Sequence, residues 1–312
     1  MRILVPGHFR ADLERALADL GPDLVGYDEA GAPEAGSAGT VALFRWWLTT
    51  EQGERLLEDH PSIRWVHSGS AGVDHILTPR LREREIVLTT SAGVHAPSIA
   101  EWVVAAMLAA MKNLPDMARR QRERRFEKVA RPELTGQTVV FFGAGHIATA
   151  IAERLAPFGV RMRAVRRSGE RHAVIREIAP ALAPACRDAD WLIVAAPLTP
   201  DTARAVDAEV LAALPSSARL INVSRGELVD EPALVDTLRD GRIAGAILDV
   251  FAEEPLPAGH PFWAMENVLV LPHTTWRSPN VRQRQIDLFA ENVRRFADGR
   301  ELLNVVDLER GY

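Results

Sequence analysis

The chain has 312 residues, which is enough for two domains that each bury a core of their own. Apolar residues make up 47% of the sequence and charged residues 25%, as in ordinary globular proteins, and the formal net charge of −5 excludes a general attraction to nucleic acid or anionic membranes. Cys186 is the one cysteine, which excludes an internal disulfide; with neither a secretory signal nor a bilayer-spanning apolar run in the sequence, we expect a cytoplasmic protein.

The N-terminal part of the chain alternates short apolar strands with helices. We expect strands at residues 2–5, 41–44, 63–67 and 86–88, and helices at 11–20 and 51–58. Such alternation is typical of a parallel sheet with helices on both faces. No glycine fingerprint follows any of these strands, so this sheet is not an obvious nucleotide site.

A loop of small residues follows the strand at 63–67. It runs from Ser68 to Asp74 and lies where ligands of parallel sheets bind, and its backbone N–H groups can converge on an anion. An ordinary glycine loop capped by Asp74 explains the same residues.

A long apolar helix is predicted from Ser98 to about residue 113. Ser98 is expected to cap this helix, with Glu101 as its partner in a capping box. The apolar residues exceed a single buried stripe, so we expect the helix to lie between domains or against another subunit. The Arg-rich run at 119–125 is broken by Gln121 and Glu123, and we interpret it as a solvated helix face rather than a nucleic-acid site.

The central motif of the sequence is a glycine turn between a strand and a helix. Val139–Phe142 is a continuous apolar run, as in a strand buried on both faces, and Gly143-Ala-Gly-His-Ile-Ala148 opens the helix that follows. Gly143 permits the tight turn, and Gly145 has no Cβ that would keep a pyrophosphate from the backbone. Because the helix N-terminus also offers unpaired N–H groups to this anion, the sequence predicts a dinucleotide site.

The next predicted strand, 159–165, bears on the choice of dinucleotide. An acid near the end of this strand would hold the ribose of NAD. Arg166, Arg167 and Ser168 take that place, and two guanidinium groups and a hydroxyl can bind a 2′-phosphate. We therefore predict NADP(H) as the cofactor, with NAD as the alternative. A solvated basic face would explain the same residues, because further arginines lie close by.

Four more strands are expected at 191–195, 219–223, 243–249 and 268–271, with helices between them. Asp230 is the expected cap of the helix at 232–239. In a doubly wound sheet the turns after these strands lie on the edge that faces the cofactor. We predict that the cofactor contacts residues of these turns and of the glycine turn: Gly143, Gly145, His146, Ile147, Pro197, Thr202 and Val223.

Three ionisable side chains follow consecutive strands: Arg225, Glu254 and His273. Each alone has an ordinary explanation, as a turn cap, a solvated acid or a loop histidine. Together they supply what carbonyl reduction needs: a guanidinium to bind a carboxylate and polarise the adjacent carbonyl, an imidazole to protonate the developing alkoxide, and a carboxylate to fix the tautomer of the imidazole. Glu253 is equally placed for the last role, and spacing alone does not separate the two neighbours.

The chain resembles the D-isomer-specific 2-hydroxyacid dehydrogenase family over nearly its whole length. The motifs that carry the resemblance are Gly143–Ala148, Ile221–Asp230, Leu248–Leu256 and Leu271–His273, together with Gly69–Asp74 and Ala92–Glu101. The resemblance implies that Arg225 binds the substrate carboxylate and carbonyl oxygen, that His273 is the general acid, and that Glu254 is its partner.

Further site residues are implied by the same resemblance. Asp249 matches a position near the nicotinamide. Backbone N–H groups of Ala71, Gly72 and Val73 would bind the substrate carboxylate. Trp276 stands where many members have smaller residues, and either narrows the substrate pocket or packs in the hinge. Trp46 and Trp47 are placed to touch substrate or to pack in the domain core, and no metal site is expected.

The resemblance also implies an α/β fold of two doubly wound parallel-sheet domains with a cleft between them. Residues 1–97 and 280–312 would form a flavodoxin-like substrate domain, and residues 98–279 a dinucleotide-binding Rossmann domain. Family members are usually homodimers, with helices near the first crossing at the interface, so a homodimer is expected here.

The arginines at 166 and 167 resemble the pattern of glyoxylate and hydroxypyruvate reductases that use NADPH. We therefore predict NADPH-dependent reduction of a small 2-oxo acid, such as glyoxylate or hydroxypyruvate, to the D-2-hydroxy acid. The alternatives are an NAD-dependent dehydrogenase of another 2-hydroxy acid and a dinucleotide-sensing binding protein.

Overall fold

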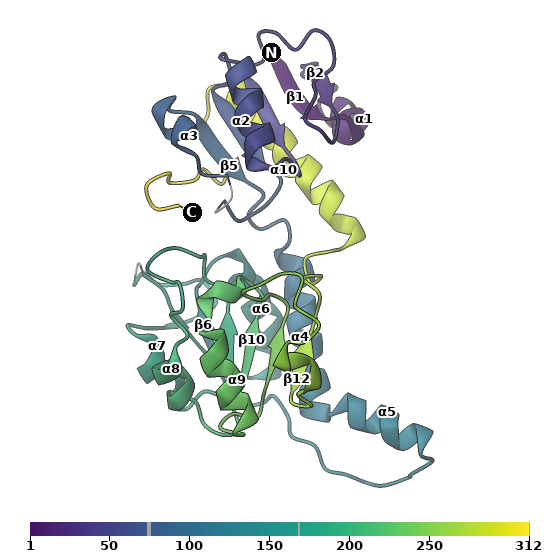
Figure 1. Cartoon of the computed structure of the whole chain (residues 1–312), viewed down its shortest axis with the longest axis vertical. Coiled ribbons are helices and arrows are strands. Elements are labelled where there is room, and N and C mark those ends of the chain that lie inside the picture. The colour runs from purple at the N-terminus through teal and green to yellow at the C-terminus, as the bar shows by residue number, and fades with distance from the viewer. Residues whose placement is uncertain (74–75, 168, 312) are drawn as a thin grey trace. The chain divides into compact units, whose positions relative to one another are not determined.

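The structure is a computed structural model that describes residues 1–73, 76–167 and 169–311. The chain divides into two compact units, residues 1–95 with 278–312 (unit 1) and residues 96–277 (unit 2). Each unit contains its own parallel sheet covered by helices (Figure 1). The predicted α/β class with two parallel sheets is therefore confirmed. Over the described ranges, no helix has both the length and the apolar character needed to cross a membrane.

Unit 1 is built on a five-stranded parallel sheet in the order β2-β1-β3-β4-β5. Two helices cover each face: α2 and α3 on one, α1 and α10 on the other (Figure 1). This strand order is of the flavodoxin type, in which ligands bind beyond the carboxyl ends of the strands. The elements are β1 (Arg2–Pro6), α1 (Gly7–Ala16), β2 (Asp23–Tyr27), β3 (Ala42–Arg45), α2 (Thr50–Asp59), β4 (Trp65–Ser68), α3 (Pro79–Glu83), β5 (Val87–Thr90) and α10 (Pro279–Ala297).

The C-terminal helix α10 completes the core of unit 1. Phe289 of α10 stacks on Phe44 of β3 and Trp65 of β4, with ring centroids 4.6 and 5.4 Å apart. Ile3 and Val5 of β1 belong to the same buried cluster. Since these apolar side chains would otherwise face water, their burial explains why the end of the chain returns to the N-terminal sheet.

Unit 2 contains a seven-stranded parallel sheet in the order β12-β11-β10-β9-β6-β7-β8. Helices α4 and α6 pack on one face and α7, α8 and α9 on the other. Because β6 lies between β7 and β9, the chain reverses its winding at β6, the place where doubly wound sheets bind dinucleotides. The strands are β6 (Thr138–Phe142), β7 (Arg161–Val165), β8 (Glu177–Ala179), β9 (Trp191–Val194), β10 (Arg219–Asn222), β11 (Gly245–Leu248) and β12 (Val268–Val270).

The helices of unit 2 are α4 (Ala96–Lys112), α5 (Leu114–Arg122), α6 (His146–Leu155), α7 (Leu182–Cys186), α8 (Ala208–Ala213) and α9 (Glu231–Arg239). Asp230 caps α9 as predicted, accepting a hydrogen bond from the Ala233 N–H at 3.2 Å. The predicted cap of α4 is wrong. The helix already begins at Ala96, and the Ser98 hydroxyl donates instead to the carbonyl oxygen of Thr275 at 2.8 Å.

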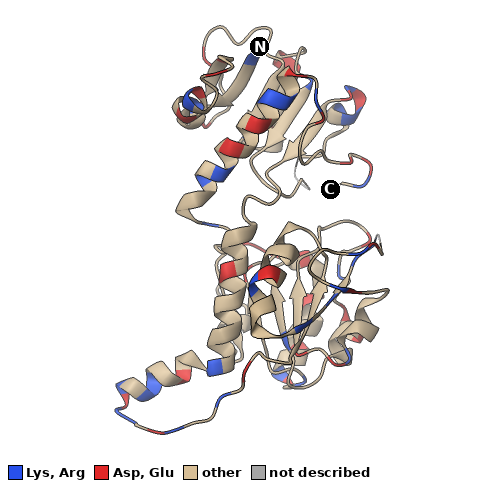
Figure 2. Cartoon of the chain, turned by 180° about the vertical axis from the view of Figure 1, so that it is seen from behind, with Lys and Arg blue, Asp and Glu red and all other residues tan. Residues whose placement is uncertain are grey.

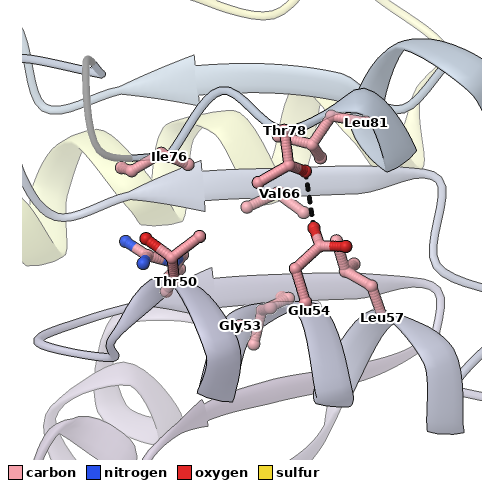
Figure 3. A pocket seen from close by; sticks show the side chains of 10 residues that line it. Thr50, Gly53, Glu54, Leu57, Val66, Ile76, Thr78 and Leu81 are labelled. Atoms are coloured by element: carbon pink, nitrogen blue, oxygen red, sulfur yellow. Dashed lines mark hydrogen bonds between the residues drawn. The ribbon is translucent and has the colours of Figure 1, made fainter.

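A small pocket, open to solvent, lies in unit 1 between α2 and the sheet (Figure 3). Across it the Thr78 hydroxyl donates to Glu54 at 2.5 Å, and Arg80 donates to the same carboxylate at 2.8 Å. No predicted site residue lines this pocket, so it is not the predicted substrate site.

Candidate active site

The predicted catalytic residues follow strands whose ends lie in register. Asn222, Leu248 and Val270 are the paired last residues of β10, β11 and β12. Arg225 and His273 each come three residues beyond their strand. Parallel strands with aligned ends deliver the following residues to one edge of the sheet, which explains how positions far apart in sequence share the same edge of unit 2.

His273 and Glu254 are in direct contact. Nδ1 of His273 lies 2.7 Å from Oε2 of Glu254. Because a carboxylate only accepts, Nδ1 carries the hydrogen and Nε2 is the end of the ring available for proton transfer. The second oxygen of Glu254 accepts from the Phe251 N–H at 3.0 Å. The side chains of His273 and Glu254 are 42% and 35% exposed, so a substrate can reach the pair.

The loop that carries His273 is held in an uncommon conformation. His273 has φ +46°, in the left-handed region that costs a non-glycine residue about 1–3 kcal/mol. The indole N–H of Trp276 donates to the His273 carbonyl at 3.0 Å, and Trp276 also packs beside the buried cluster of α4 and α6. Both predicted roles of Trp276, in the substrate pocket or in the hinge, stay predictions.

Asp249 accepts hydrogen bonds from the residues that follow His273 in the same loop. Its carboxylate, in a side chain only 1% exposed, accepts from the Thr274 N–H at 2.8 Å and from the Thr275 hydroxyl at 2.5 Å. Burial raises the pKa of Asp249, and the hydrogen bonds from Thr275 and Thr274 act in the opposite direction. Contact with the nicotinamide stays a prediction, while the structure gives this carboxylate the task of holding the residues after His273.

The turn that carries Arg225 is fixed by its neighbours. The Asn222 amide donates to the Arg225 carbonyl at 2.8 Å, and the Ser224 hydroxyl donates to the Ala196 carbonyl at 2.5 Å. At Gly226 an added Cβ would overlap the backbone of Phe251, so only glycine lets this turn approach the loop before Glu254. Arg225 itself is half-buried.

The glycine turn after β6 is closely packed at Gly143 and open at Gly145. Gly143 has φ +96°, and a Cβ there would come within 2.7 Å of the Ala195 carbonyl oxygen. Gly145 precedes α6, and a Cβ built on it would meet nothing within 4 Å. His146 is exposed in the first turn of α6, whereas Ile147 packs beside the buried cluster under it. The open glycine and the helix N-terminus fit a pyrophosphate.

The other predicted cofactor residues lie on the same unit. Arg166 directly follows β7 and forms a long ion pair of 3.7 Å with Glu170, whose side chain is 76% exposed. Arg167 is exposed, and Ser168 lies outside the described residues. Val223, the residue directly after β10, is buried. Pro197 is exposed, and its carbonyl accepts from the Thr202 hydroxyl at 2.7 Å, a hydrogen bond that shapes the turn after β9.

The predicted substrate loop belongs to unit 1. The buried Gln285 of α10 donates to the Gly69 carbonyl at 3.0 Å, and the Ser70 hydroxyl donates to the Gly72 carbonyl at 2.8 Å. Ala71 is exposed and Val73 is buried, whereas Asp74 lies outside the described residues. The loop is thus tied down on both sides of Ala71.

The two tryptophans after β3 have different surroundings. Trp46 packs edge-on against Phe9 and Phe44 and lies where a Cβ at Gly69 would be, so it belongs to the domain core. Trp47 is 74% exposed, with φ +52°. Of the two predicted roles, contact with substrate or packing in the domain core, Trp46 therefore has the second.

Glu231 is a site residue that the sequence pattern does not reveal. One of its oxygens accepts from the Ala252 N–H at 3.2 Å, and the other lies 3.2 Å from Nε2 of His260. It thereby anchors both ends of the loop that contains Glu254. Its position directly after the helix cap Asp230 gives an ordinary reason for an acid, which conceals the second role.

Known proteins are similar in sequence to this chain. Residues 104–275 match the family "D-isomer specific 2-hydroxyacid dehydrogenase, NAD binding domain". A glyoxylate reductase of Thermofilum pendens is 32% identical over 257 residues, which cover 79% of this chain and 75% of that protein.

Solved structures resemble the whole chain. A D-isomer specific 2-hydroxyacid dehydrogenase from Xanthobacter autotrophicus Py2, in complex with NADPH and MES, has a TM-score of 0.87 at 30% identity, covering 100% of this chain and 99% of the other. An NADPH-dependent glyoxylate/hydroxypyruvate reductase from Sinorhizobium meliloti, in complex with NADP and sulfate, has a TM-score of 0.82 at 28% identity, with coverage of 100% and 99%. As the resemblance of its motifs predicts, the chain belongs to the D-isomer specific 2-hydroxyacid dehydrogenase family.

Proposed function

We propose that this chain uses NADPH to reduce a small 2-oxo acid of the glyoxylate or hydroxypyruvate kind to the D-2-hydroxy acid. The observation that carries the proposal is the 2.7 Å hydrogen bond between His273 and Glu254, at a sheet edge that also carries Arg225. The names of the relatives from Thermofilum pendens and Sinorhizobium meliloti support this choice of substrate.

Three side chains of unit 2 divide the chemistry between them. Arg225 binds the substrate carboxylate and polarises the neighbouring C2 carbonyl, because a guanidinium can direct two parallel N–H donors at these oxygens. NADPH, when bound, supplies the hydride that C2 receives. Protonated His273 gives the proton on Nε2 to the carbonyl oxygen, and Glu254 orients the ring and stabilises the imidazolium. Addition of the hydride at C2 turns the carbonyl oxygen into an alkoxide, the proton converts this alkoxide into the hydroxyl group, and His273 is left neutral.

The remaining predicted residues bind cofactor and substrate. The N–H groups at the start of α6, around Gly145, bind the pyrophosphate. The other proposed cofactor contacts are those predicted from the sequence: His146, Ile147, Pro197, Thr202, Val223 and Asp249. The substrate carboxylate accepts from the backbone N–H groups of Ala71, Gly72 and Val73. Arg166 and Arg167 bind the 2′-phosphate, since the weak, solvent-exposed ion pair of Arg166 with Glu170 is readily replaced by a dianion.

Initial rates with NADPH and NADH over a panel of small 2-oxo acids test the proposed function. We expect turnover of glyoxylate or hydroxypyruvate and a higher kcat/KM with NADPH. Preference for NADH with another 2-oxo acid would establish the alternative dehydrogenase. Intact dinucleotide binding without turnover of any 2-oxo acid would instead identify a sensing protein.

The two arginines after β7 provide a separate prediction. Replacing Arg166 and Arg167 together by Ala removes two charge-assisted partners of the 2′-phosphate, and we expect the Kd for NADPH to rise by roughly 10²-fold or more. NADH lacks this phosphate, so its Kd should change by less than about threefold. Fluorescence titration of both nucleotides measures the difference. Equal weakening of NADPH and NADH would contradict the proposed phosphate contact.

We further propose that the protein is a cytoplasmic homodimer and that α5, with the loop after it, binds the second copy. This segment projects from the rest of unit 2 (Figure 1), and no residue of α5, which is described throughout, is buried in the single chain. Phe126 is 97% exposed, Leu114 53% and Trp102 on α4 41%. Exposed large apolar side chains on a projecting segment, such as Leu114 and Phe126, are typical of an interface.

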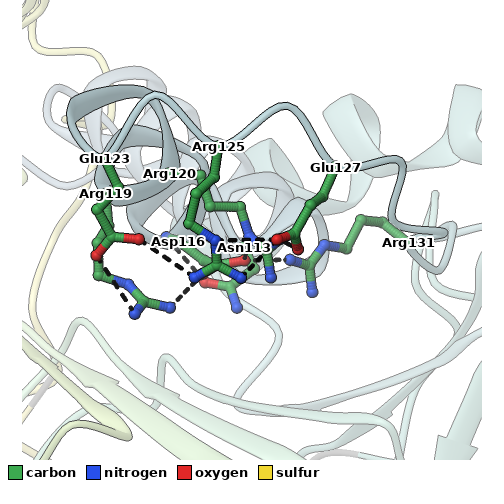
Figure 4. Close-up of polar contacts among 8 residues, drawn as sticks. All are labelled: Asn113, Asp116, Arg119, Arg120, Glu123, Arg125, Glu127 and Arg131. Atoms are coloured by element: carbon green, nitrogen blue, oxygen red, sulfur yellow. Dashed lines mark hydrogen bonds and ion pairs between the residues drawn. The ribbon is translucent and has the colours of Figure 1, made fainter.

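A network of ion pairs holds the projecting segment in shape. Asp116 accepts from Arg119, Arg120 and Arg131 at 2.6, 2.7 and 2.6 Å (Figure 4). Arg120, followed by Arg119, lowers the pKa of Asp116 to about 2. Acidic and basic residues are interleaved along the whole projecting segment (Figure 2). This pattern favours an ordered segment, called the arm, over a nucleic-acid surface.

Phe126→Asp tests the interface. A charge placed where an apolar side chain would be buried should weaken dimerisation at least about tenfold. Light scattering after size-exclusion chromatography gives the mass at several protein concentrations. Trp263→Asp is a matched control, because Trp263 is also exposed on unit 2, at 54%, but lies outside the arm. A monomeric wild-type protein would contradict the proposal.

A further inference from the structure

Residues 166–172 (the arginine segment) begin with Arg166 and Arg167, directly after β7, and end with His172. Its Nδ1 accepts from the backbone N–H groups of Val174 and Ile175 at 3.2 and 3.0 Å. Burial, and after it the positive charge of Arg166, lowers the pKa of His172, which keeps Nδ1 unprotonated and able to accept. With Nδ1 as acceptor, the hydrogen of the neutral imidazole is on Nε2.

Nε2 of His172 connects this segment to the pyrophosphate-binding helix. It donates to the hydroxyl oxygen of Thr149 in α6, 2.9 Å away. The Thr149 hydroxyl donates in turn to the carbonyl oxygen of Gly145, also at 2.9 Å. A continuous chain of hydrogen bonds therefore runs from the far end of the arginine segment to the glycine at the start of α6.

We propose that His172 and Thr149 are positioning residues that fix the arginine segment against α6 and so set the preference for NADPH over NADH. The proposal rests on the proposed function, in which Arg166 and Arg167 bind the 2′-phosphate. Neither His172 nor Thr149 is required to touch the cofactor in this role. Their hydrogen bonds hold the arginines in place before the nucleotide arrives.

The physical reason is the conformational entropy that Arg166 and Arg167 lose when the nucleotide binds. The segment that carries them leaves β7 after its last residue, Val165, and returns to the core at Ile175, which is fully buried. Without an anchor, Arg166 and Arg167 would have to be ordered each time a 2′-phosphate binds, and that ordering would reduce the affinity for NADPH. The contact of His172 with Thr149 orders them in advance. NADH carries no 2′-phosphate, so its binding gains little from this order.

Variants at Thr149 separate positioning from general stability. Thr149→Val removes the hydroxyl at nearly constant shape, and loss of a single hydrogen bond of this kind should raise the Kd for NADPH about three- to tenfold. The Kd for NADH should change by less than about twofold, because only the 2′-phosphate depends on the arginines. Thr149→Ser keeps the hydroxyl and should retain the wild-type ratio of the two constants.

His172→Ala should reduce the preference for NADPH over NADH at least as much as Thr149→Val does. The Thr149→Val/His172→Ala double variant should reduce this preference no further than His172→Ala alone, because both changes break the same contact. Kd values are measured by fluorescence titration on the full chain without substrate, and thermal unfolding shows that each variant is folded.

The outcomes distinguish this inference from the proposed function. If wild-type protein prefers NADPH and both single variants keep its Kd ratio, the positioning role is overturned while the arginine contact stands. Equal weakening of NADPH and NADH also overturns it, because the hydrogen bonds would then support the pyrophosphate turn alone. A wild-type protein without preference for NADPH overturns the inference together with the proposed role of Arg166 and Arg167.

Discussion

His273→Ala is expected to lower kcat for reduction of the 2-oxo acid by about 10²–10⁴-fold, the usual contribution of a general acid. The alkoxide that forms at C2 would have to take its proton from water instead of from a positioned Nε2. Cofactor binding should be nearly unchanged, because the imidazole acts on the substrate oxygen. Pre-steady-state reduction, followed by the loss of NADPH absorbance, measures the effect directly.

Two further variants define the role of this pair. Glu254→Gln keeps the size of the side chain but loses the charge that stabilises the imidazolium, and its loss in kcat should be smaller than that of His273→Ala. Glu177→Gln is the matched control, since Glu177 also pairs with a cationic side chain of unit 2, Arg163 at 2.9 Å, and has no proposed part in the chemistry. Turnover by His273→Ala equal to that of wild type would remove His273 from the mechanism.

The local sequence signals predict the elements that position this site. The run Val139–Phe142 forms the fully buried core of β6, and the glycine turn leads directly into α6. Turns after β10 and β12 carry Arg225 and His273 at equal distances from paired strand ends. These features are predictable because a buried parallel strand and its turn are encoded within about ten adjacent residues.

Two strands, β8 and β2, give much weaker signals than the others. β8 (Glu177–Ala179) has three residues, none of them fully buried, and is not predicted. β2 (Asp23–Tyr27) contains Gly26 and follows Gly21-Pro22, a pattern that indicates a turn rather than a strand. Position at a sheet edge is not the cause, because β5 and β12 are also edge strands and both are predicted.

Contacts between distant residues are the part that local patterns do not predict. Ser98 precedes Glu101 with the spacing of a capping box, yet its hydroxyl bonds Thr275, 177 positions away. The buried Asp249 likewise accepts from Thr275, and no short motif pairs an acid with a threonine at that separation. Such partners depend on which loops the folded sheet brings together, and this is decided by tertiary packing.

Arg225→Gln is expected to lower kcat/KM for a 2-oxo acid by roughly 10²–10³-fold, the loss typical when a donor to a reacting carbonyl is removed. The variant retains a polar side chain of similar reach but has no charge to pair with the carboxylate. Arg225→Lys restores the charge without the planar pair of donors, so we expect it to recover only part of the activity. Arg204→Gln is the control, because Arg204 forms an ion pair with Asp230 on the same unit and has no proposed contact with substrate.

The substrate dependence of this loss identifies its cause. An aldehyde such as glycolaldehyde offers the same reacting carbonyl as a 2-oxo acid but has no carboxylate. If Arg225 binds the carboxylate, Arg225→Gln should reduce kcat/KM much more for glyoxylate than for the aldehyde, since only the acid loses the paired hydrogen bonds. Equal losses for both substrates would mean that the guanidinium acts on the carbonyl alone. No loss for either would show that the edge of the sheet beyond β10 does not bind the substrate.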